Sequence, residues 1–540
     1  MATERDTVGE IQRGSGHRVR RIKGALFEAG LVVATLVGIA ALLVLFGYIA
    51  FDAFRPLTAS ARWYLLYFAT LVAPMAAFTL YARRRPAVRA ANARAFAAVG
   101  GSLAVALTTY VVAESVSPYD VGIYVFFAGV PLLLVAAYGR TAGRNEYTGP
   151  ALPVSVVLGV AAGAVTYPLV RPAVGVLAPW VVYLATVTLP VAGVLGAVVA
   201  RQRTRREGVI GGGAIVAGAV VVAVAGVALG GDPSLWIVLF SVFVAPAGYV
   251  LLRTAQERPE GRVGLAGPFV LAGGVLLGAA LERGLGVDGL NGFLTPQLLT
   301  ASWDGLNASN AGVYPQIVGS IVIVGTMAVL AFPVGAGAAV YLEEYAPNSG
   351  WRGRLGSLLE VNISNLAGVP SVVYGLLGLA LFRNALGFGT GIVFSAAATL
   401  GLLILPIVVV STQEAIRSVP DELQEASYGV GASRWQTLRN VVLPEAVPGI
   451  LTGTILALAR AVGETAPLVI IAVATTTYTP PAGLFSSGTA LPLQIFAARS
   501  NVDVAFRHGV VPATAVVLLA LMLLMNTTAI LVRNKYQSEE

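Results

Sequence analysis

The sequence predicts an all-α polytopic membrane protein with about 14 transmembrane helices. The 540 residues are 56% hydrophobic and only 11% charged, whereas an ordinary soluble protein carries about a quarter charged residues. Several apolar runs reach the roughly 20 residues that a helix needs to cross a bilayer. Because a backbone in hydrocarbon must satisfy its own hydrogen bonds, such runs become helices.

The expected spans follow these apolar runs along the chain. The first comes after a basic stretch, but its apolar core is too long for a signal peptide and no small-residue cleavage pattern follows it, so it is expected to be retained. The fourteen spans are predicted at residues 25–51, 63–82, 95–114, 121–138, 152–170, 178–200, 208–229, 235–252, 264–282, 315–340, 362–382, 388–411, 446–474 and 509–532.

Basic residues alternate from loop to loop in the first half of the chain. Arginine and lysine hold loops on the cytoplasmic side of a membrane. With the N-terminus inside, the first five inner segments hold 20 Lys and Arg, and the four outer loops between them hold three. This predicts a cytoplasmic-membrane protein with both termini in the cytoplasm. The net charge of +8 then reflects arginines that hold loops on the cytoplasmic side, not nucleic-acid binding.

The composition also excludes several kinds of site. The chain has no cysteine and only two histidines, His17 and His508, so neither a metal site nor a cofactor is expected. A Walker A phosphate loop needs Gly-Lys followed by Ser or Thr. The only lysines, Lys23 and Lys535, precede Gly and Tyr. The chain is therefore predicted not to be an ATPase, and not an enzyme.

Two parts of the chain differ in the length of their loops and in their polar motifs. Residues 1–262 form hairpin after hairpin with short loops, and are predicted to be a membrane extension of about eight helices. A packing role and a ligand-binding role for this part stay open. Residues 263–540, with a core of about 315–533, have longer loops and polar signatures. The outer loop Arg283–Val313 carries Asn307-Ala-Ser309, an N-glycosylation sequon.

The loop of residues 421–444, DELQEASYGVGASRWQTLRNVVLP, is predicted to form two short helices on the cytoplasmic side. Pro420 and Asp421 suit a helix start, and Gly429 and Gly431 interrupt that helix. Ser433 with Gln436 matches a capping box that restarts it. Trp435, Leu438 and Val442 are expected on one face, and Pro444 is expected to end the unit. Periodicity alone fits a docking element and a surface helix equally well.

This loop resembles the EAA loop of ABC importer permeases. The matching residues are Glu425-Ala426-Ser427, Gly431, Val441 and Leu443-Pro444, with Ser427 and Val441 as mild departures from Ala and Ile. The resemblance implies a coupling helix that fits a groove on a separate ATPase subunit. Glu425 and Gly431 would position the helix and its turn, and Trp435 is the candidate anchor. It also implies that the last six spans form a type I importer transmembrane domain.

The next span carries two ionisable residues, Arg460 and Glu464, in LARAVGETAPLVIIA. A charge at membrane depth costs a few kcal/mol and usually faces a pathway, although an internal pair that only neutralises itself is the alternative. Their four-residue spacing predicts one helical face. The guanidinium fork suits an oxyanion. The Glu464 carboxylate could accept the O–H of protonated phosphate and repel proton-free oxyanions such as sulfate.

The string ARAVGETAPL resembles the signature of phosphate permeases of the PstA type, as do segments 312–321, 332–347 and 362–382. Ala466-Pro467 favours PstA over the sister PstC type. This resemblance implies phosphate as cargo, with Arg460, Glu464 and Thr465 on its path. It also implies a PstC-type sister permease, a dimeric PstB-type ATPase and an external PstS-type phosphate-binding protein. Members of this family usually have six spans, whereas here about eight further spans precede those six.

Three other functions remain as alternatives. An ABC permease for molybdate or sulfate would keep the architecture and change the cargo. An ion-coupled secondary transporter would not need the coupling loop, and a degenerate scaffold or sensor would not need the charge pair. The small residues Gly335, Gly337, Gly368 and Pro370 fit either hinges or tight helix packing.

Overall fold

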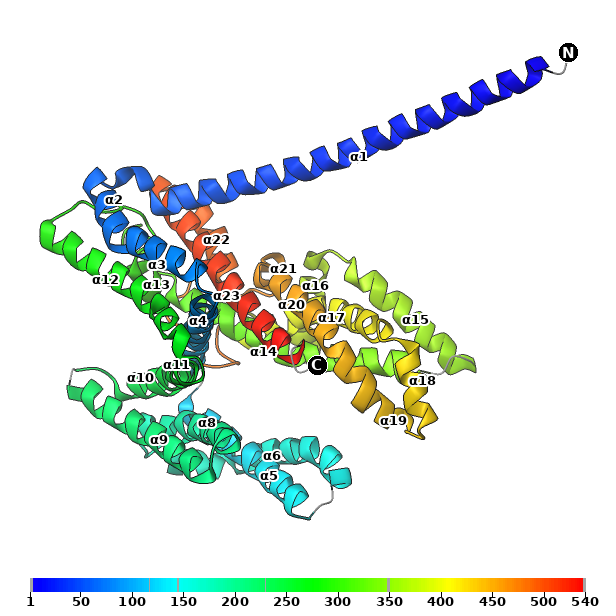
Figure 1. Ribbon diagram of the computed structural model, residues 1–540. Coiled ribbons are helices and arrows are strands. Elements are labelled where there is room, and N and C mark those ends of the chain that lie inside the picture. The colour runs from blue at the N-terminus through cyan, green and yellow to red at the C-terminus, as the bar shows by residue number, and fades with distance from the viewer. Residues whose placement is uncertain (1–2, 116, 143–144, 229, 347–349, 538–540) are drawn as a thin grey trace.

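The computed structural model in Figure 1 describes residues 3–115, 117–142, 145–228, 230–346 and 350–537. Within these ranges the chain is built of helices, and β pairing is limited to two isolated bridges. The described part contains 11 helices that are long and apolar enough to cross a membrane, or 12 if one bent pair forms a single span. The prediction of an all-α, multi-pass membrane protein is confirmed.

The difference from fourteen spans falls on two of the predicted ones, 121–138 and 152–170. Both are helical, in α5 (Pro118–Ala142) and α6 (Asn145–Val174). The side chains of both helices are described only in part, so these two predicted spans lie outside the part of the chain on which the count of 11 or 12 rests. The other twelve predicted spans each coincide with a long helix or with the bent pair.

The first helix, α1 (Thr3–Phe54), stands apart from the other helices over most of its length (Figure 1). A methyl group added at Gly24, Gly30 or Gly38 would meet no atom within 4 Å. Only its last turns pack, against α23 (Val511–Gln537) and the preceding turn η9 (Phe506–Val510). There Ala53 is fully buried, and Asp52 Oδ2 lies 3.3 Å from His508 Nδ1.

The next part of the chain consists of four pairs of consecutive helical segments, which we call hairpins, and several of these segments contain a 3-10 or π-helical turn. In chain order the elements are η1 (Pro56–Thr58), α2 (Ala61–Tyr67), η2 (Phe68–Val72), α3 (Ala73–Arg83), α4 (Pro86–Ser115), α5, α6, α7 (Pro179–Tyr183), η3 (Leu184–Thr188), α8 (Leu189–Gln202), α9 (Arg205–Ala228), α10 (Pro233–Val238), η4 (Leu239–Val244), α11 (Ala245–Glu257), η5 (Pro259–Ala266) and α12 (Gly267–Leu285).

Each of these hairpins has a proline in its first span, at residue 74, 131, 190 or 246. This recurrence is a feature of the hairpins that was not predicted from the sequence. In three of the four, a π-helical turn (η2, η3 or η4) comes immediately before the proline-containing helix. Proline lacks the N–H that an α-helix needs and clashes with the preceding turn, so a wider turn relieves it. The signal for an internal repeat was therefore present in the proline positions.

The two ends of this hairpin region meet. The backbone N–H of Asn291 donates to Thr58 Oγ1 at 2.9 Å, and that of Ser60 donates to the carbonyl of Asp288 at 3.2 Å. The N–H of Phe293 donates to the carbonyl of Ala53 at 3.0 Å. Helices α2 to α12 thus leave the end of α1 and return to the same place, as expected of a segment inserted into a loop.

The remaining elements form the part of the chain that carries the polar signatures. They are α13 (Pro296–Thr300), α14 (Tyr314–Val340), η6 (Tyr341–Tyr345), α15 (Gly350–Ala367), α16 (Ser371–Gly378), η7 (Leu379–Ala385), α17 (Val393–Arg417), α18 (Asp421–Gly429), α19 (Arg434–Thr437), η8 (Leu438–Val442), α20 (Leu443–Val462), α21 (Ala466–Ile470), α22 (Leu491–Arg499), η9 and α23.

The core of this part lies where α14, α17 and α20 pack together. Small residues allow the close approach, since a methyl group at Gly335 would lie 2.8 Å from Val408 and one at Gly453 would lie 2.3 Å from Ser411. Gly335 therefore serves packing. The chain instead bends by 111° between α15 and α16, next to Gly368 and Pro370, two of the other residues considered as hinges. A methyl group at Gly337 would meet no atom within 4 Å.

Candidate functional site

The loop between α17 and α20 has the helix–turn–helix form that the sequence predicts. Helix α18 begins at Asp421 directly after Pro420 and ends at Gly429. Gly431 takes a left-handed backbone conformation with φ of 86°, which glycine adopts without strain. Ser433 caps α19 by accepting from the N–H of Gln436, whose side chain accepts from the N–H of Ser433. The predicted capping box is confirmed.

The second helix of the loop differs from its prediction at both ends. Leu438 and Val442 are buried against Ala415, Val419 and Ile450, but Trp435 is 56% exposed, so the three residues do not share one buried face. Pro444 does not end the unit, because one continuous helix runs from Arg434 to Val462. The π-turn η8 comes directly before the helical segment that contains Pro444, as η2, η3 and η4 do before three of the hairpin prolines. This wider turn allows the helix to continue through Pro444.

The tip of this loop presents apolar side chains to its surroundings. The exposed ones are Leu423, Tyr428, Val430, which is 86% exposed, and Trp435. Glu425 and Ala426 of the motif are also exposed, Pro444 is exposed, and Leu443 is half-buried. Exposed apolar residues gathered on a short polar segment are typical of a protein-binding surface. We call the exposed residues Leu423, Glu425, Tyr428, Val430 and Trp435 the coupling tip.

A contact that the sequence analysis missed joins the two helices of the loop. The hydroxyls of Ser427 and Thr437 lie 2.9 Å apart, with Thr437 buried. Ser427 is the residue that departs from the second alanine of the motif. The substitution is therefore not a loss, because it adds a hydrogen bond that fixes α18 on α19.

Replacing Gly431 with valine is expected to weaken attachment of the separate ATPase subunit that the resemblance of this loop implies by about tenfold, because a β-branched residue in the left-handed region costs roughly 1–2 kcal/mol. A methyl group at Gly431 would meet nothing within 4 Å, so the effect is one of backbone conformation. Gly431→Asn is the control, since asparagine tolerates this region. Equal retention of the ATPase by both variants in a pull-down would contradict this.

The predicted charge pair forms, but the single long helix that was predicted to carry both residues is interrupted between them. The structure places the end of α20 at Val462, so the predicted span 446–474 is wrong beyond that residue: Gly463 to Thr465 break the helix before α21. Arg460 in the last turn still reaches Glu464, with 3.4 Å between Nε and Oε1. Thr465 occupies the N-cap position of α21, and its hydroxyl donates to the carbonyl of Gly463.

Arg460 keeps half of its side chain exposed while Glu464 is only 17% exposed. One turn earlier, Leu456 is 67% exposed on the same helix. A charged guanidinium at membrane depth is costly against lipid tails, so this face of α20 suits a water-filled pathway or another protein. The pair with Glu464 uses the Nε edge, which leaves the two Nη groups of the fork for a ligand.

The helix break is held by close packing against α16. A methyl group added at Gly375 would lie 2.9 Å from Cα of Pro467 and 2.9 Å from Ile470 Cδ1. Pro467 and Leu468 are buried. The position of α21, and with it the turn that presents Glu464, is therefore set by the bent pair α15–α16.

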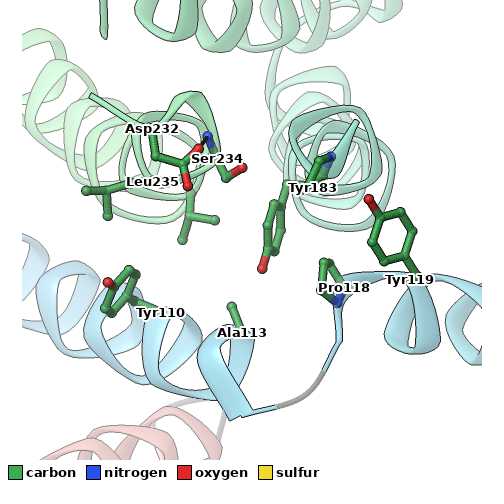
Figure 2. A pocket seen from close by; sticks show the side chains of 10 residues that line it. Tyr110, Ala113, Pro118, Tyr119, Tyr183, Asp232, Ser234 and Leu235 are labelled. Atoms are coloured by element: carbon green, nitrogen blue, oxygen red, sulfur yellow. Dashed lines mark hydrogen bonds between the residues drawn. The ribbon is translucent and has the colours of Figure 1, made fainter. Parts of the chain in front are cut away.

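The hairpin region holds a cavity of about 350 Å³ between α4, α5, α7 and α10 (Figure 2). Tyr110, Tyr183 and Asp232 face it, and the Asp232 carboxylate also accepts from the N–H of Ser234 at 2.8 Å. None of the described residues that line it is a lysine, arginine or histidine. A site with one carboxylate and no cation does not suit an oxyanion.

The loop Arg283–Val313, which is predicted to lie outside, places its sequon on a turn. The carboxylate of Asp304 accepts from the backbone N–H groups of Leu306 at 2.8 Å and Asn307 at 3.1 Å, and these bonds lower the pKa of Asp304. Asn307 itself is exposed. Its glycosylation stays a prediction.

Comparison with known families matches residues 331–535 to the family described as binding-protein-dependent transport system inner membrane component. This range contains the coupling tip, the Arg460–Glu464 pair and the bent pair α15–α16.

Known relatives are similar to part of the chain. A phosphate transport system permease protein PstA 1 of Mycobacterium tuberculosis (strain CDC 1551 / Oshkosh) is 44% identical over 160 residues, which are 30% of this chain and 51% of that protein. A phosphate transport system permease protein PstC of Haemophilus influenzae is 27% identical over 292 residues, covering 49% of this chain and 87% of that protein. The chain thus spans 51% of the first of these relatives. An inward-facing structure of the MetNI methionine ABC transporter is 19% identical, with a TM-score of 0.32, and the match covers 42% of this chain and 94% of that one.

Proposed function

Because residues 331–535 match the inner membrane component of binding-protein-dependent transport systems, we propose that this chain is the permease subunit of an ATP-driven importer for inorganic phosphate. The observation that carries the proposal is the pairing, within that range, of an exposed coupling tip with a half-exposed Arg460 at a helix break. The coupling tip would bind an ATPase subunit, and the Arg460 guanidinium would donate hydrogen bonds to an oxyanion. The PstA and PstC relatives favour phosphate as the cargo.

The proposed partners follow from surfaces that the chain leaves open. A dimeric ATPase of the PstB type would bind the coupling tip, because no lysine of this chain can build a Walker A loop. A sister permease of the PstC type would cover the face that exposes Arg460. A PstS-type phosphate-binding protein would deliver the anion from outside. In this assembly the chain is a non-catalytic subunit without a cofactor of its own.

The membrane and the orientation are part of the proposal. The arginine bias of the loops supports the cytoplasmic membrane with both chain ends inside. It also puts the coupling tip on the side where ATP is available.

The division of the chain at residue 262 stays a prediction, and several contacts between helices cross it. Helix α12 packs against α2, η2 and α3, whereas α1 packs against α23. These contacts favour an arrangement in which α1 belongs to the permease domain and helices α2 to α12 are inserted into its first outer loop. The role of the inserted hairpins would then be to pack around α14 and α23, which α4 contacts.

Uptake of radiolabelled phosphate by the full transporter, in cells without their own high-affinity system, tests the proposed function. Uptake is expected to persist against excess sulfate or molybdate and to require the ATPase. Uptake of molybdate or sulfate in place of phosphate would keep the transporter class and overturn the cargo. Transport that survives loss of the ATPase would favour an ion-coupled carrier.

The same assay tests the role of Glu464. With Glu464→Gln, sulfate is expected to compete with phosphate, because the carboxylate that repels proton-free oxyanions is gone. Unchanged selectivity in this variant would contradict that role. Glu445→Gln, at an exposed position at the other end of α20, is the matched control.

A further inference from the structure

A cluster of polar side chains joins three helices beside the coupling loop. Arg417, the last residue of α17, donates from Nη2 to Glu343 Oε1 at 2.5 Å and lies 3.5 Å from Glu360 Oε1. The buried Gln413 donates from Nε2 to the same two carboxylates, at 3.1 and 3.2 Å. Glu343 belongs to η6 at the end of α14, and Glu360 belongs to α15. One guanidinium and one amide therefore connect the C-terminal ends of α14 and α17 to the middle of α15.

On one side, this cluster is attached to the coupling loop. Only Ser418, Val419 and Pro420 separate Arg417 from α18. Val419 is buried in the same apolar cluster as Leu438 of the loop. The Arg434 guanidinium of α19 also lies 6.0 Å from the ring centroid of Tyr345, which follows the Glu343 turn. A displacement of the coupling tip would therefore move the cluster.

On the other side, the cluster leads to the helix break at Glu464. Glu360 lies on α15, which bends by 111° into α16. Gly375 of α16 packs directly on Pro467 of α21, and α21 begins immediately after the Gly463–Thr465 break. Packed side chains and rigid helices thus form a continuous path from the coupling loop to Arg460 and Glu464.

We propose that Arg417 is a positioning residue that couples the movement of the ATPase dock to the anion site through the bent pair α15–α16. This inference rests on the proposed function. Glu343 is only 15% exposed and Gln413 is buried, so the cluster is partly shielded from water and its charges interact strongly. Without the guanidinium, Glu343 and Glu360 would face each other as like charges, and the repulsion would separate α15 from the η6 end of α14.

The test uses the full transporter, reconstituted in lipid vesicles with its ATPase and binding protein. Arg417→Ala is expected to raise the ATP hydrolysed per anion transported by about fivefold or more, the scale of a typical coupling between sites, while the complex stays assembled. Glu360→Gln is expected to raise the ratio in the same direction but less. Glu414→Gln is the matched control: its carboxylate lies 3.7 Å from Arg417 Nη1 but on α17 itself, so it joins no second helix and should leave the ratio unchanged.

An unchanged ratio in both Arg417→Ala and Glu360→Gln would overturn the inference. If Arg417→Ala does not assemble, the charge exchange Arg417→Glu with Glu360→Arg decides: a ratio closer to wild type than that of Glu360→Arg alone supports coupling through this pair, and a ratio no better contradicts it. The ratio can be measured with any anion that the complex transports. A wrong cargo assignment would therefore be seen with the wild type and would leave this test intact.

Discussion

Replacing Arg460 with alanine is expected to reduce phosphate uptake by about tenfold to a hundredfold, the largest loss expected from any single change in the substrate path. Each hydrogen bond to a charged group contributes about 1.5–3 kcal/mol, and about 1.4 kcal/mol corresponds to a factor of ten. Arg460→Lys keeps the charge but loses the planar fork, so it should recover only part of the uptake. The measurement is the initial rate of radiolabelled phosphate uptake at equal membrane content of the two proteins.

The matched control is Arg383→Ala, which removes an exposed arginine near the end of η7 in the same part of the chain. It should transport like the wild type. The Arg460→Ala complex must also retain its ATPase. Equal uptake by Arg460→Ala and wild type would show that the pair with Glu464 only neutralises itself, and the anion path would have to lie elsewhere.

The second large effect is expected at the coupling tip. Trp435→Ala should lower the affinity for the ATPase by about thirtyfold, because truncating a tryptophan at the centre of an interface typically costs about 2 kcal/mol or more. Since the side chain is exposed and the buried contacts of this helix come from Leu438 and Val442, the permease itself should insert and fold normally. Retention of the ATPase on detergent-solubilised complex measures the effect.

Phe485→Ala serves as the control for this change. Phe485 is an exposed aromatic residue in the loop before α22, and the proposed topology puts that loop on the opposite side of the membrane. It should leave ATPase binding unchanged. An ATPase that stays bound to Trp435→Ala as firmly as to the wild type would move the anchor to another exposed residue of the tip, such as Val430 or Tyr428.

Local signals in the sequence were enough to predict the coupling loop. Ser433 and Gln436 define a capping box within three residues, and a glycine is the usual residue for the left-handed turn found at Gly431. The errors occurred where hydrophobicity alone was used. Apolar residues continue through 446–474, so nothing in their number reveals that Gly463 breaks the helix. Pro444 was expected to end a helix, whereas a π-turn accommodates it.

Contacts between distant segments could not be predicted in this way. The ion cluster at Arg417 depends on Glu343 and Glu360, which lie on other helices, and a single sequence gives no pairing between them. The pairing of α1 with α23 is hidden for the same reason. The proline recurrence in the hairpins could be read from the sequence, but only the structure shows that a π-helical turn precedes the proline in three of the four hairpins.

The pairing of α1 with α23 has a consequence for how the protein is made. Asp52 and His508 are 456 residues apart, so α1 enters the membrane early in synthesis and must wait for nearly the whole chain before its partner helix exists. Contacts between such distant residues form slowly, because the intervening chain must first be ordered. Folding of the inserted hairpins would shorten the loop that must close before α1 can pack against α23, since Ser60 and Asp288 bring the two flanks of the hairpin region together. During biogenesis the folded hairpins would therefore return the growing chain to the end of α1.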